Sequence, residues 1–172
     1  MIEFVPVSRE RFPTVYGKMI AAFPLEERRD MFDQEECFKN PCFKFFEIYD
    51  GTDVGFISLW VFGEFVFIEH LAIDENIRSK GYGSQAIELV KETFNLPIVL
   101  EAEAPVTPQQ IKRINFYGRL GFKVNDYGYY QPSYHGEEPV PLKLLSFPQL
   151  LTGEEYDLFI KRTREHPYKK HI

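Results

Sequence analysis

The chain has 172 residues with 20 basic and 26 acidic side chains, which gives a formal net charge of −6. This length suits one domain, and shares of 44% hydrophobic and 27% charged residues exclude a disordered or fibrous chain. Net negative charge without a long basic run makes the chain a poor candidate for nucleic-acid binding, and no apolar run is long enough to span a membrane. The unusual number is the aromatic share of 16%, which indicates an aromatic-rich core or an aromatic ligand surface.

The location of the protein is predicted from its first residues and its cysteines. The N-terminal stretch MIEFVPVSRERF has no charged head followed by an apolar run, so we expect no signal peptide. The two cysteines, Cys37 and Cys42, are expected to be free thiols, although a disulfide between them is left open. Together these features favour a cytoplasmic protein.

The first half of the chain predicts strands, two helices and a hairpin. In chain order we expect a strand over 2–7, a helix over 9–22 capped by Ser8, a helix running from Pro24 to Asn40, and strands over 43–49, 54–62 and 65–73. Asp50-Gly51 and Gly63-Glu64 provide the turns between the last three strands. These strands are therefore expected to be consecutive and antiparallel.

The second half changes to alternating strands and helices. A helix over 83–94 and a strand over 96–104 complete a βαβ unit, so the strands that flank this helix should be parallel. Thr107 and Pro108 open a further helix that ends before Gly121, and a strand pair over about 121–131 and 140–146 follows. The tail over 152–166 is expected to form an exposed helix.

These elements predict a mixed α/β (α+β) fold. We expect a central twisted mixed sheet of about seven strands flanked by helices on both faces. Residues 1–146 should form this domain, and residues 147–172 should form a C-terminal helical extension of the same domain.

The loop within residues 74–90 is the most informative segment. Arg78, Lys80, Gly81, Gly83 and Ser84 lie between a predicted strand and a predicted helix. A helix N-terminus presents unpaired N–H groups, glycines let the backbone approach an anion, and flanking cations add charge. A pyrophosphate is therefore the expected ligand.

Two other phosphate-binding patterns fit this loop less well. A P-loop would need Gly-Lys-Ser/Thr after a longer glycine spacing, which is absent. Residues 81–86 formally match the Rossmann pattern G-x-G-x-x-A, with Glu101 or Glu103 about 20 residues further on. However, seven residues, Asp74 to Lys80, separate the strand from the first glycine, and the preceding strands form hairpins. A glycine-rich turn with solvated charges is the structural alternative.

A third interpretation comes from a family resemblance. Arg78-Ser79-Lys80-Gly81-Tyr82-Gly83 resembles motif A, R/Q-x-x-G-x-G/A, of the GNAT superfamily of N-acetyltransferases. The preceding FVFIEHLAID looks like the fourth strand of that family, and residues 115–122, NFYGRLGF, are similar to the end of its motif B. The resemblance covers roughly residues 1–146. One departure is Gln110, which stands where the family often has an Asn.

The resemblance implies a GNAT-like acyl-CoA N-acyltransferase fold, with acetyl-CoA as cosubstrate and no metal. In the family, the fourth and fifth strands splay apart and pantetheine fills the gap like an added strand. The implied cofactor-binding residues are Leu71, Ala72, Ile73, Arg78, Ser79, Lys80, Gly81, Tyr82, Gly83, Ser84, Gln110, Arg113 and Tyr117.

Acetyl transfer to an amine needs an acceptor for the amine proton, an N–H donor for the oxyanion, and a proton for the departing thiolate. By resemblance, Tyr117 is the expected general acid; the alternative is a core tyrosine. Glu69 is the expected general base, because alternation places it with Phe67 and Leu71 on an apolar face, where desolvation should raise its pKa. The alternative for Glu69 is a paired structural carboxylate.

Acceptor binding is assigned to two groups of residues. Glu101 and Glu103 share a strand face and are expected to line an acidic mouth for a cationic amine, unless they are edge charges. Tyr130 and Tyr134 lie in the tyrosine- and proline-rich segment 127–141, and with Trp60 they are expected to wall an acceptor pocket. A rigid loop with packing tyrosines explains the same residues.

The sequence therefore predicts an N-acetyltransferase that moves the acetyl group of acetyl-CoA to a primary amine of a small molecule or peptide by direct attack in a ternary complex. No metal is expected, because the histidines are scattered at positions 70, 135, 166 and 171. Alternatives are a catalytically silent acyl-CoA-binding module and a nicotinamide-binding oxidoreductase. We expect neither a nucleic-acid nor a membrane partner, and a homodimer through residues 147–172 is left open, since GNAT relatives often dimerise.

Overall fold

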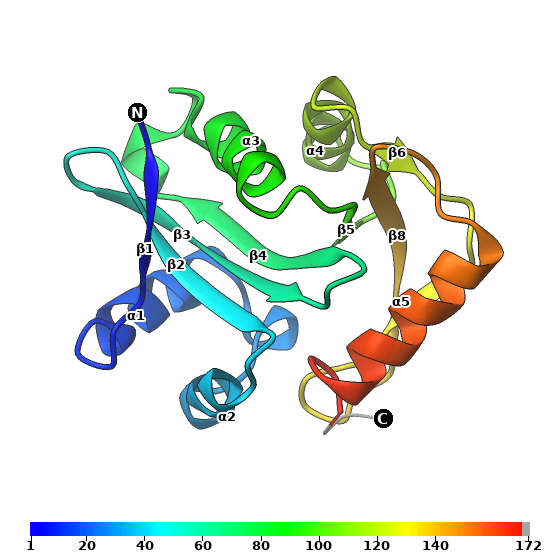
Figure 1. Ribbon diagram of the computed structural model, residues 1–172, viewed down its shortest axis with the longest axis horizontal. Helices are drawn as coiled ribbons and strands as arrows, with labels where there is room; N and C mark the ends of the chain where they lie inside the picture. The colour runs from blue at the N-terminus through cyan, green and yellow to red at the C-terminus, as the bar shows by residue number, and fades with distance from the viewer. Residues whose placement is uncertain (170–172) are drawn as a thin grey trace.

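One sheet of eight strands organises the protein, which we describe from a computed structural model over residues 1–169 (Figure 1). His171 and the end of the predicted extension lie outside the described residues. The strands are β1 Glu3–Pro6, β2 Phe43–Tyr49, β3 Asp53–Val61, β4 Val66–Ile73, β5 Ile98–Ala102, β6 Lys123–Val124, β7 Tyr129–Gln131 and β8 Val140–Phe147. Their order is β1-β2-β3-β4-β5-β8-β6, and β7 pairs with β8. The predicted mixed sheet is confirmed, with one strand more than expected.

Helices cover both faces of this sheet. They are α1 Phe12–Ala22, α2 Met31–Glu36, α3 Tyr82–Phe94, α4 Pro108–Arg119 and α5 Gly153–Glu165, with short 3-10 helices η1 Leu25–Glu27, η2 Cys37–Lys39 and η3 Glu75–Ile77. Figure 1 shows α3 and α4 on one face and α1 and α2 on the other. None of the helices within residues 1–169 combines the length and the apolar character needed to cross a membrane.

The two faces of the sheet have different cores. The core on the α1 face is built largely from aromatic side chains, among them Phe45, Phe56 and Phe67, while the core on the α3 face is mainly aliphatic. Edge-to-face contacts such as Phe45 on Phe56 fill the aromatic side. The high phenylalanine content therefore serves largely to pack one face of the sheet.

The predicted helix from Pro24 to Asn40 is wrong as a single element. The chain forms η1, leaves the helical conformation at Arg28, with φ −146° and ψ 161°, and begins α2 only after Asp30. Asp30 is the reason for the restart, because its side chain accepts from the N–H of Asp33 at 2.8 Å and caps α2. The break allows Arg29 to turn inward toward the sheet, where it is buried.

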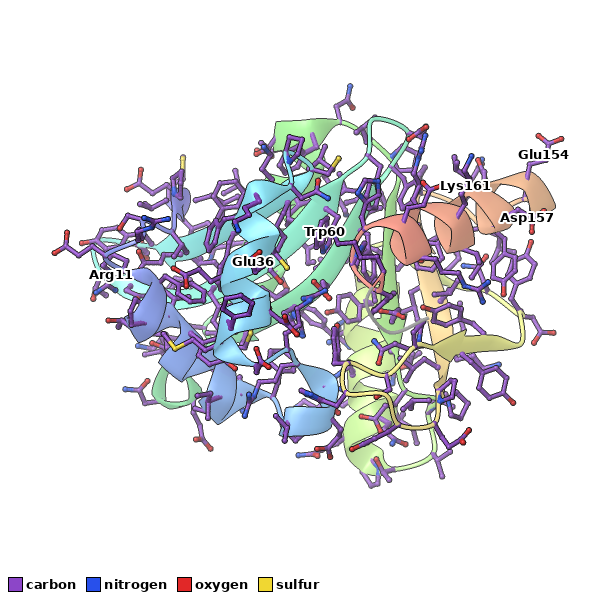
Figure 2. All side chains as sticks on the ribbon, turned by 90° about the horizontal axis from the view of Figure 1, so that it is seen from below. Arg11, Glu36, Trp60, Glu154, Asp157 and Lys161 are labelled. Atoms are coloured by element: carbon purple, nitrogen blue, oxygen red, sulfur yellow. The ribbon has the colours of Figure 1, made fainter. Side chains whose placement is uncertain are left out.

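The C-terminal helix is not the exposed element predicted from the sequence. Thr152 and Glu155 form a capping box at the start of α5, and Phe159 and Thr163 on its inner side are buried. Figure 2 shows Glu154, Asp157 and Lys161 on the opposite side, pointing away from the sheet. The helix therefore buries one face against the core and leaves only the other in solvent.

Strands β4 and β5 are parallel, as predicted, but pair for only part of their length. The ladder joins Val66 to Ile98 and ends where Ile68 meets Leu100. Beyond that point β4 continues to Ile73, paired only with β3 on its other side. The parting of these two strands, expected from the family resemblance, is thus present and opens a gap in the middle of the sheet.

Gly55 fixes the course of the free end of β4. A Cβ at Gly55 would lie 2.2 Å from the carbonyl oxygen of Ala72 and 3.0 Å from the Cα of Ile73. We predict that Gly55→Ala lowers the free energy of unfolding by about 1–3 kcal/mol, measured by urea denaturation, because backbone must shift to accommodate the methyl group.

Gly17→Ala is the matched control. Gly17 lies inside α1 with no atom within 4 Å of the added Cβ, so alanine should stabilise the helix by roughly 0.5–1 kcal/mol. Equal effects of the two substitutions would contradict the proposed clash at β4.

Candidate functional site

The glycine loop lies at the end of β4 and leads into α3. Ser79, with φ 72°, and Gly81, with φ 83°, both adopt the left-handed conformation just before α3 begins at Tyr82. Alternation of left- and right-handed residues turns successive N–H groups to one side and forms a concave anion-binding surface. Arg78, Ser79, Lys80 and Gly81 are all exposed, so this surface is open to a ligand.

Two residues of this loop have structural contacts of their own. The Tyr82 hydroxyl donates to Asp50 Oδ2 at 2.9 Å, so its tip turns toward the β2–β3 turn. The Arg78 Nε donates to the carbonyl oxygen of Ile73 at 3.2 Å, across the end of β4. The Ile73 carbonyl belongs to the part of β4 predicted to face pantetheine, and it is therefore already hydrogen-bonded to Arg78.

The two sequence motifs touch at Gly83. A Cβ added to Gly83 would lie 3.3 Å from the ring of Phe116, so α3 and α4 pack closely here and a larger residue would require the ring to shift by a few tenths of an ångström. The ring of the next residue, Tyr117, packs edge-on against Phe116 and Phe122. Burial raises the pKa of Tyr117, and its hydroxyl makes no hydrogen bond to any residue from 1 to 169.

A β-bulge lies at Glu69, where the sequence predicted strict alternation. Ser58 pairs with His70 and Leu59 with Ile68, so Glu69 has no partner on β3. Phe67 lies in the aromatic core, whereas Leu71 lies against the aliphatic core on the other face. The prediction that Glu69 and Leu71 share a face is therefore wrong. The bulge adds one residue to β4, so the residues after Glu69 point to the opposite faces from those that strict alternation gives.

Glu69 is held by a buried ion pair with Arg29. The two guanidinium nitrogens donate to the two carboxylate oxygens at 3.0 and 2.7 Å. Trp60 Nε1 donates to one oxygen at 2.9 Å and the Tyr134 hydroxyl to the other at 2.7 Å. The side chains of Glu69 and Arg29 are only 1% and 4% exposed. Four donors therefore fill the four acceptor positions of this carboxylate.

The expectation of a raised pKa at Glu69 is wrong. Burial by itself raises the pKa, but the charges of Arg29 and His70 and the hydrogen bonds from Arg29 and Trp60 outweigh it and lower the pKa to about 2. Burial lowers the pKa of the neighbouring His70, against the charge of Glu69, and the His70 ring is hydrogen-bonded to the Ser58 hydroxyl and to the carbonyl oxygen of Glu27. Glu69 is thus a permanently ionised carboxylate at neutral pH.

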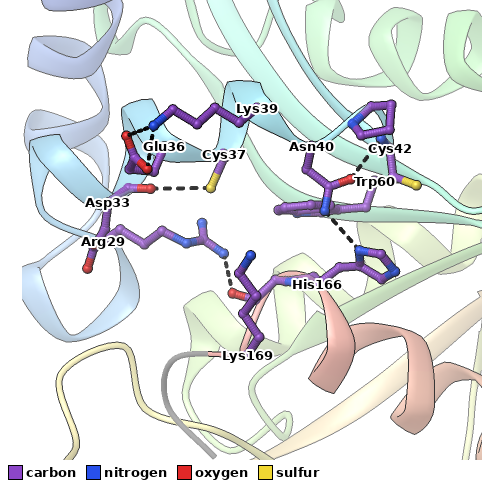
Figure 3. Close-up of a pocket in the computed structure, with 12 residues that line it drawn as sticks. Arg29, Asp33, Glu36, Cys37, Lys39, Asn40, Cys42, Trp60, His166 and Lys169 are labelled. Carbon is purple, nitrogen blue, oxygen red and sulfur yellow. Dashed lines mark hydrogen bonds and ion pairs between the residues drawn. The ribbon is translucent and has the colours of Figure 1, made fainter.

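Trp60 and Tyr134 face a cation of the protein itself. The Arg29 guanidinium lies 6.0 Å from the Trp60 ring centre and 5.0 Å from that of Tyr134. A cavity of about 380 Å³ lies between α2 and the segment after α5, and Arg29 and Trp60 are among the residues that line it (Figure 3). Trp60 therefore lines this cavity and not the larger one at the gap between β4 and β5.

A larger cavity, of about 460 Å³, lies where β4 and β5 part. It is lined by Glu69 and His70 of β4, the end of β5 with the residues that follow it, Gln110 and Arg113 of α4, the η1 region, Tyr134, and Val140 to Leu142. The predicted residues Glu101, Glu103 and Tyr134 come together here. Tyr130 is 60% exposed and lies outside this lining.

The wall of this cavity is strongly acidic. Besides Glu69, its lining includes Glu26, Glu27, Glu101 and Glu103, while its cation is Arg113. Burial and the nearby charge of Glu103 raise the pKa of Glu27, with Arg113 opposing them. A cavity with this balance of charge favours a cationic guest.

Glu101 is the second buried carboxylate of the cavity. It accepts from the Tyr129 hydroxyl, from the Tyr168 hydroxyl at 2.6 Å and from Gln131 Nε2 at 3.1 Å. Burial raises the pKa of Glu101 to about 7. The negative charge of Glu69 also raises this pKa, whereas the three hydrogen bonds lower it. In contrast with Glu69, no cation is paired with Glu101 within the described part of the chain.

Gln110 and Arg113 both contact Glu103. Gln110 completes the capping box of α4 by accepting from the N–H of Thr107 at 2.9 Å, and its amide nitrogen donates to Glu103 at 2.6 Å. An Arg113 nitrogen lies 3.6 Å from the other Glu103 oxygen. The side chain of Gln110 is thus committed to the start of α4 and to Glu103.

Sequence reasoning missed Arg29, Gln131 and Tyr168. Asp30 signals a helix start that would have separated Arg29 from a regular helix, but nothing local indicates that Arg29 meets Glu69, 40 residues away. Tyr168 follows the end of α5 and is fully buried although its surroundings in sequence are polar.

The remaining metal-ligating and nucleophilic side chains of residues 1–169 are arranged as follows. No group of histidine, cysteine, aspartate and glutamate there is arranged to hold a metal ion. Cys37 and Cys42 are free thiols, and burial raises the pKa of Cys37 to about 11, which makes it a poor nucleophile.

Comparison with known proteins agrees with this geometry. The family model described as "Acetyltransferase (GNAT) family" matches residues 9–122. A protein of Bacillus subtilis (strain 168) named "Putative acetyltransferase YjbC" is 31% identical, over 90% of this chain and 82% of its own length.

Solved structures give the same result. "Putative acetyltransferase from GNAT family" of Bacteroides thetaiotaomicron matches with a TM-score of 0.89 and 31% identity, over 96% of this chain and 98% of the other. Arabidopsis thaliana NAA60 in complex with acetyl-CoA matches with a TM-score of 0.63 and 16% identity, over 86% of this chain and 98% of its own, which shows a common fold.

The buried ion pair gives a prediction for stability. Arg29→Gln leaves Glu69 without its cation, so the free energy of unfolding at pH 7.5 should fall by about 3–5 kcal/mol. Because the pKa of Glu69 is lowered from 4.5, the pair's contribution is present above about pH 4.5 and is lost as the pH falls toward 2. The deficit of the variant, measured by urea denaturation, should therefore shrink at acidic pH.

Arg28→Gln is the control for this measurement. Arg28 donates to the carbonyl oxygen of Phe23 and to the Tyr16 hydroxyl, not to a carboxylate. Its deficit should be similar at pH 7.5 and pH 4. If Arg29→Gln also lowers the free energy of unfolding by the same amount at pH 7.5 and pH 4, the ionised state of Glu69 does not depend on Arg29.

Proposed function

The chain belongs to the GNAT family of acetyltransferases, and from this premise we propose that it transfers the acetyl group of acetyl-CoA to a primary amine by direct attack in a ternary complex. The observation that carries the proposal is the parting of β4 and β5: an acidic cavity opens at the gap, and the exposed glycine loop follows the free end of β4. The anionic cosubstrate would thus meet the loop and the cationic acceptor the acidic wall, so that each ligand faces a surface of opposite charge.

The glycine loop is proposed to hold the pyrophosphate of acetyl-CoA. The N–H groups of residues 79–84 would bind its oxygens at the start of α3, and Arg78 and Lys80 would add positive charge. The free edge of β4, residues 71–73, is proposed to bind pantetheine through backbone groups, with an N–H nearby for the oxyanion. Gln110 and Arg113 line the same cavity and would complete the cosubstrate side.

The reaction would form one bond and break one bond. The amine nitrogen attacks the thioester carbon, the C–N bond forms, and the C–S bond breaks. The nitrogen loses a proton, and the sulfur gains one to leave as a thiol. We propose Tyr117 as the donor of the second proton, because its hydroxyl is not committed to another residue within 1–169 and burial, which raises its pKa, keeps the phenol protonated at neutral pH.

Glu69, the general base expected from the sequence, is a weak candidate in this geometry. Its four acceptor positions are filled and its pKa is about 2, so it has little tendency to take a proton. We propose instead that Glu69 fixes the wall of the acceptor cavity by holding Arg29, Trp60 and Tyr134 in place. The acceptor would be a small-molecule or peptide amine that enters along Glu27 and Glu103.

Cosubstrate identity is tested by thermal shift. Acetyl-CoA should raise the melting temperature and NAD should not, because the loop follows the pattern of an acetyl-CoA site. Lys80→Glu should reduce the shift with acetyl-CoA sharply, since it places a negative charge at the proposed pyrophosphate. Lys161→Glu, which makes the same charge change on the outward face of α5, should leave the shift unchanged. Stabilisation by NAD alone would overturn the proposed function.

The role of Tyr117 is tested by turnover. With ethanolamine, putrescine, tyramine and a lysine-containing peptide as acceptors, release of free CoA thiol from acetyl-CoA should occur with at least one amine. Tyr117→Phe should lower kcat by about 100-fold or more while the thermal shift with acetyl-CoA is kept. An unchanged kcat would remove Tyr117 from the proton transfer. Acetyl-CoA binding without thiol release from any amine would identify a silent acyl-CoA-binding module.

A further inference from the structure

The proposed reaction needs an acceptor for the amine proton, and the cavity offers two buried carboxylates, Glu69 and Glu101. They differ in what surrounds them. Glu69 meets a guanidinium and two further donors, which fill all its acceptor positions. Glu101 meets two hydroxyls and one amide, all neutral.

The hydrogen bonds of Glu101 leave room for one more. Tyr168 and Gln131 donate to Oε1, and Tyr129 alone donates to Oε2. A carboxylate has about four acceptor positions, so one position on Oε2 is left without a donor among residues 1–169. The same count leaves none on Glu69.

Glu101 also lies at the right place in the fold. It is the first residue of β5 beyond Leu100, where the ladder to β4 ends, and it lines the cavity in the gap. The bulged residue of β4, Glu69, stands on the other side of this gap. A thioester lying between the parted strands would therefore have Glu101 on one flank.

We propose that Glu101 is the catalytic residue that takes the proton from the attacking amine. Tyr168, in the segment after α5, is a positioning residue that holds the Glu101 carboxylate at the gap. This inference rests on the proposed acetyl transfer and adds to it the identity of the base and a role for the C-terminal segment.

The position of Tyr168 is itself fixed by the core. Its side chain is fully buried, its ring packs against those of Tyr134 and Phe67, and its N–H donates to the carbonyl of Thr163 at 2.8 Å. The carbonyl of the preceding Pro167 accepts from Arg29 at 2.8 Å. Adjacent residues of this segment thus contact both buried carboxylates, Glu101 directly and Glu69 through Arg29.

The pH dependence of turnover distinguishes this role from a structural one. Burial raises the pKa of Glu101 to about 7. The pH profile of kcat for the fastest amine of the panel should therefore have an ascending limb with its midpoint near pH 7. Glu101→Gln should lower kcat by about 100-fold or more and remove that limb. It should keep the thermal shift with acetyl-CoA.

Variants of the neighbours should move the limb in opposite directions. Tyr168→Phe removes a hydrogen bond that favours the carboxylate, so the limb should move to higher pH. Glu69→Gln removes a nearby negative charge, so the limb should move to lower pH. Tyr127→Phe is the matched control, because the Tyr127 hydroxyl donates to Leu151 and does not touch Glu101; its limb should stay in place.

Stability gives a readout that needs no turnover. An acid whose pKa is raised in the folded state contributes stability that is fully present below its unfolded pKa of about 4.5 and is lost as the pH rises through about 7. Glu101→Gln removes this dependence, so its melting temperature relative to wild type should rise between pH 5 and pH 8.

The outcomes separate this inference from the proposed function. A normal rate and an unmoved limb in Glu101→Gln, with active wild type, would overturn the inference and leave the proposed function standing. A lower kcat in Tyr168→Phe with an unmoved limb would overturn the positioning role. If wild type released no CoA with any amine, the proposed function and the inference would fall together.

Discussion

A cation that pairs with only one of two buried carboxylates is the constraint from which the site follows. Arg29 pairs with Glu69 through two hydrogen bonds, and Glu101 is left with neutral donors. Both carboxylates are buried, but within residues 1–169 only Glu69 is paired with a positive charge. The pKa of Glu69 is therefore lowered to about 2, whereas burial raises that of Glu101 to about 7. The ionised Glu69 further favours the neutral form of Glu101. One group thus carries permanent charge and the other can exchange a proton near neutral pH.

The phenylalanines and the tyrosines have different roles around these carboxylates. Phenylalanines such as Phe45 and Phe56 pack the core of the α1 face, where a ring with no polar atom needs no partner. Tyrosines occupy the border between that core and the cavity, and the hydroxyls of Tyr129, Tyr134 and Tyr168 end on carboxylates. A phenol can be buried along its ring and still satisfy a charge at its tip. The high aromatic content therefore supplies both a core and the donors that a buried acidic site requires.

Much of the fold is local and could be predicted from the sequence. Alternation located β2 to β4, and the Thr107-Pro108 pair located the start of α4, because these signals depend on neighbours in the chain. The bulge at Glu69 could not be predicted, since it depends on the pairing of β4 with β3. The partner of Glu69 could not be predicted either, because it comes from a loop 40 residues earlier. A pKa expectation based on an apolar strand face was consequently wrong in sign.

The same reasoning changes how the C-terminal segment is understood. A helix with a polar outer face suggests an appendage when only its sequence is considered, yet its inner face is buried. In the chain after it, the Pro167 carbonyl accepts from Arg29 and the Tyr168 hydroxyl donates to Glu101, so this segment contacts one carboxylate directly and the partner of the other. Without Pro167 and Tyr168, Arg29 and Glu101 would each lose a buried partner, and buried polar groups are costly to leave unpaired. The C-terminal segment therefore supports both buried carboxylates, and the sheet with α1 to α4 alone would leave Arg29 and Glu101 each short of a partner.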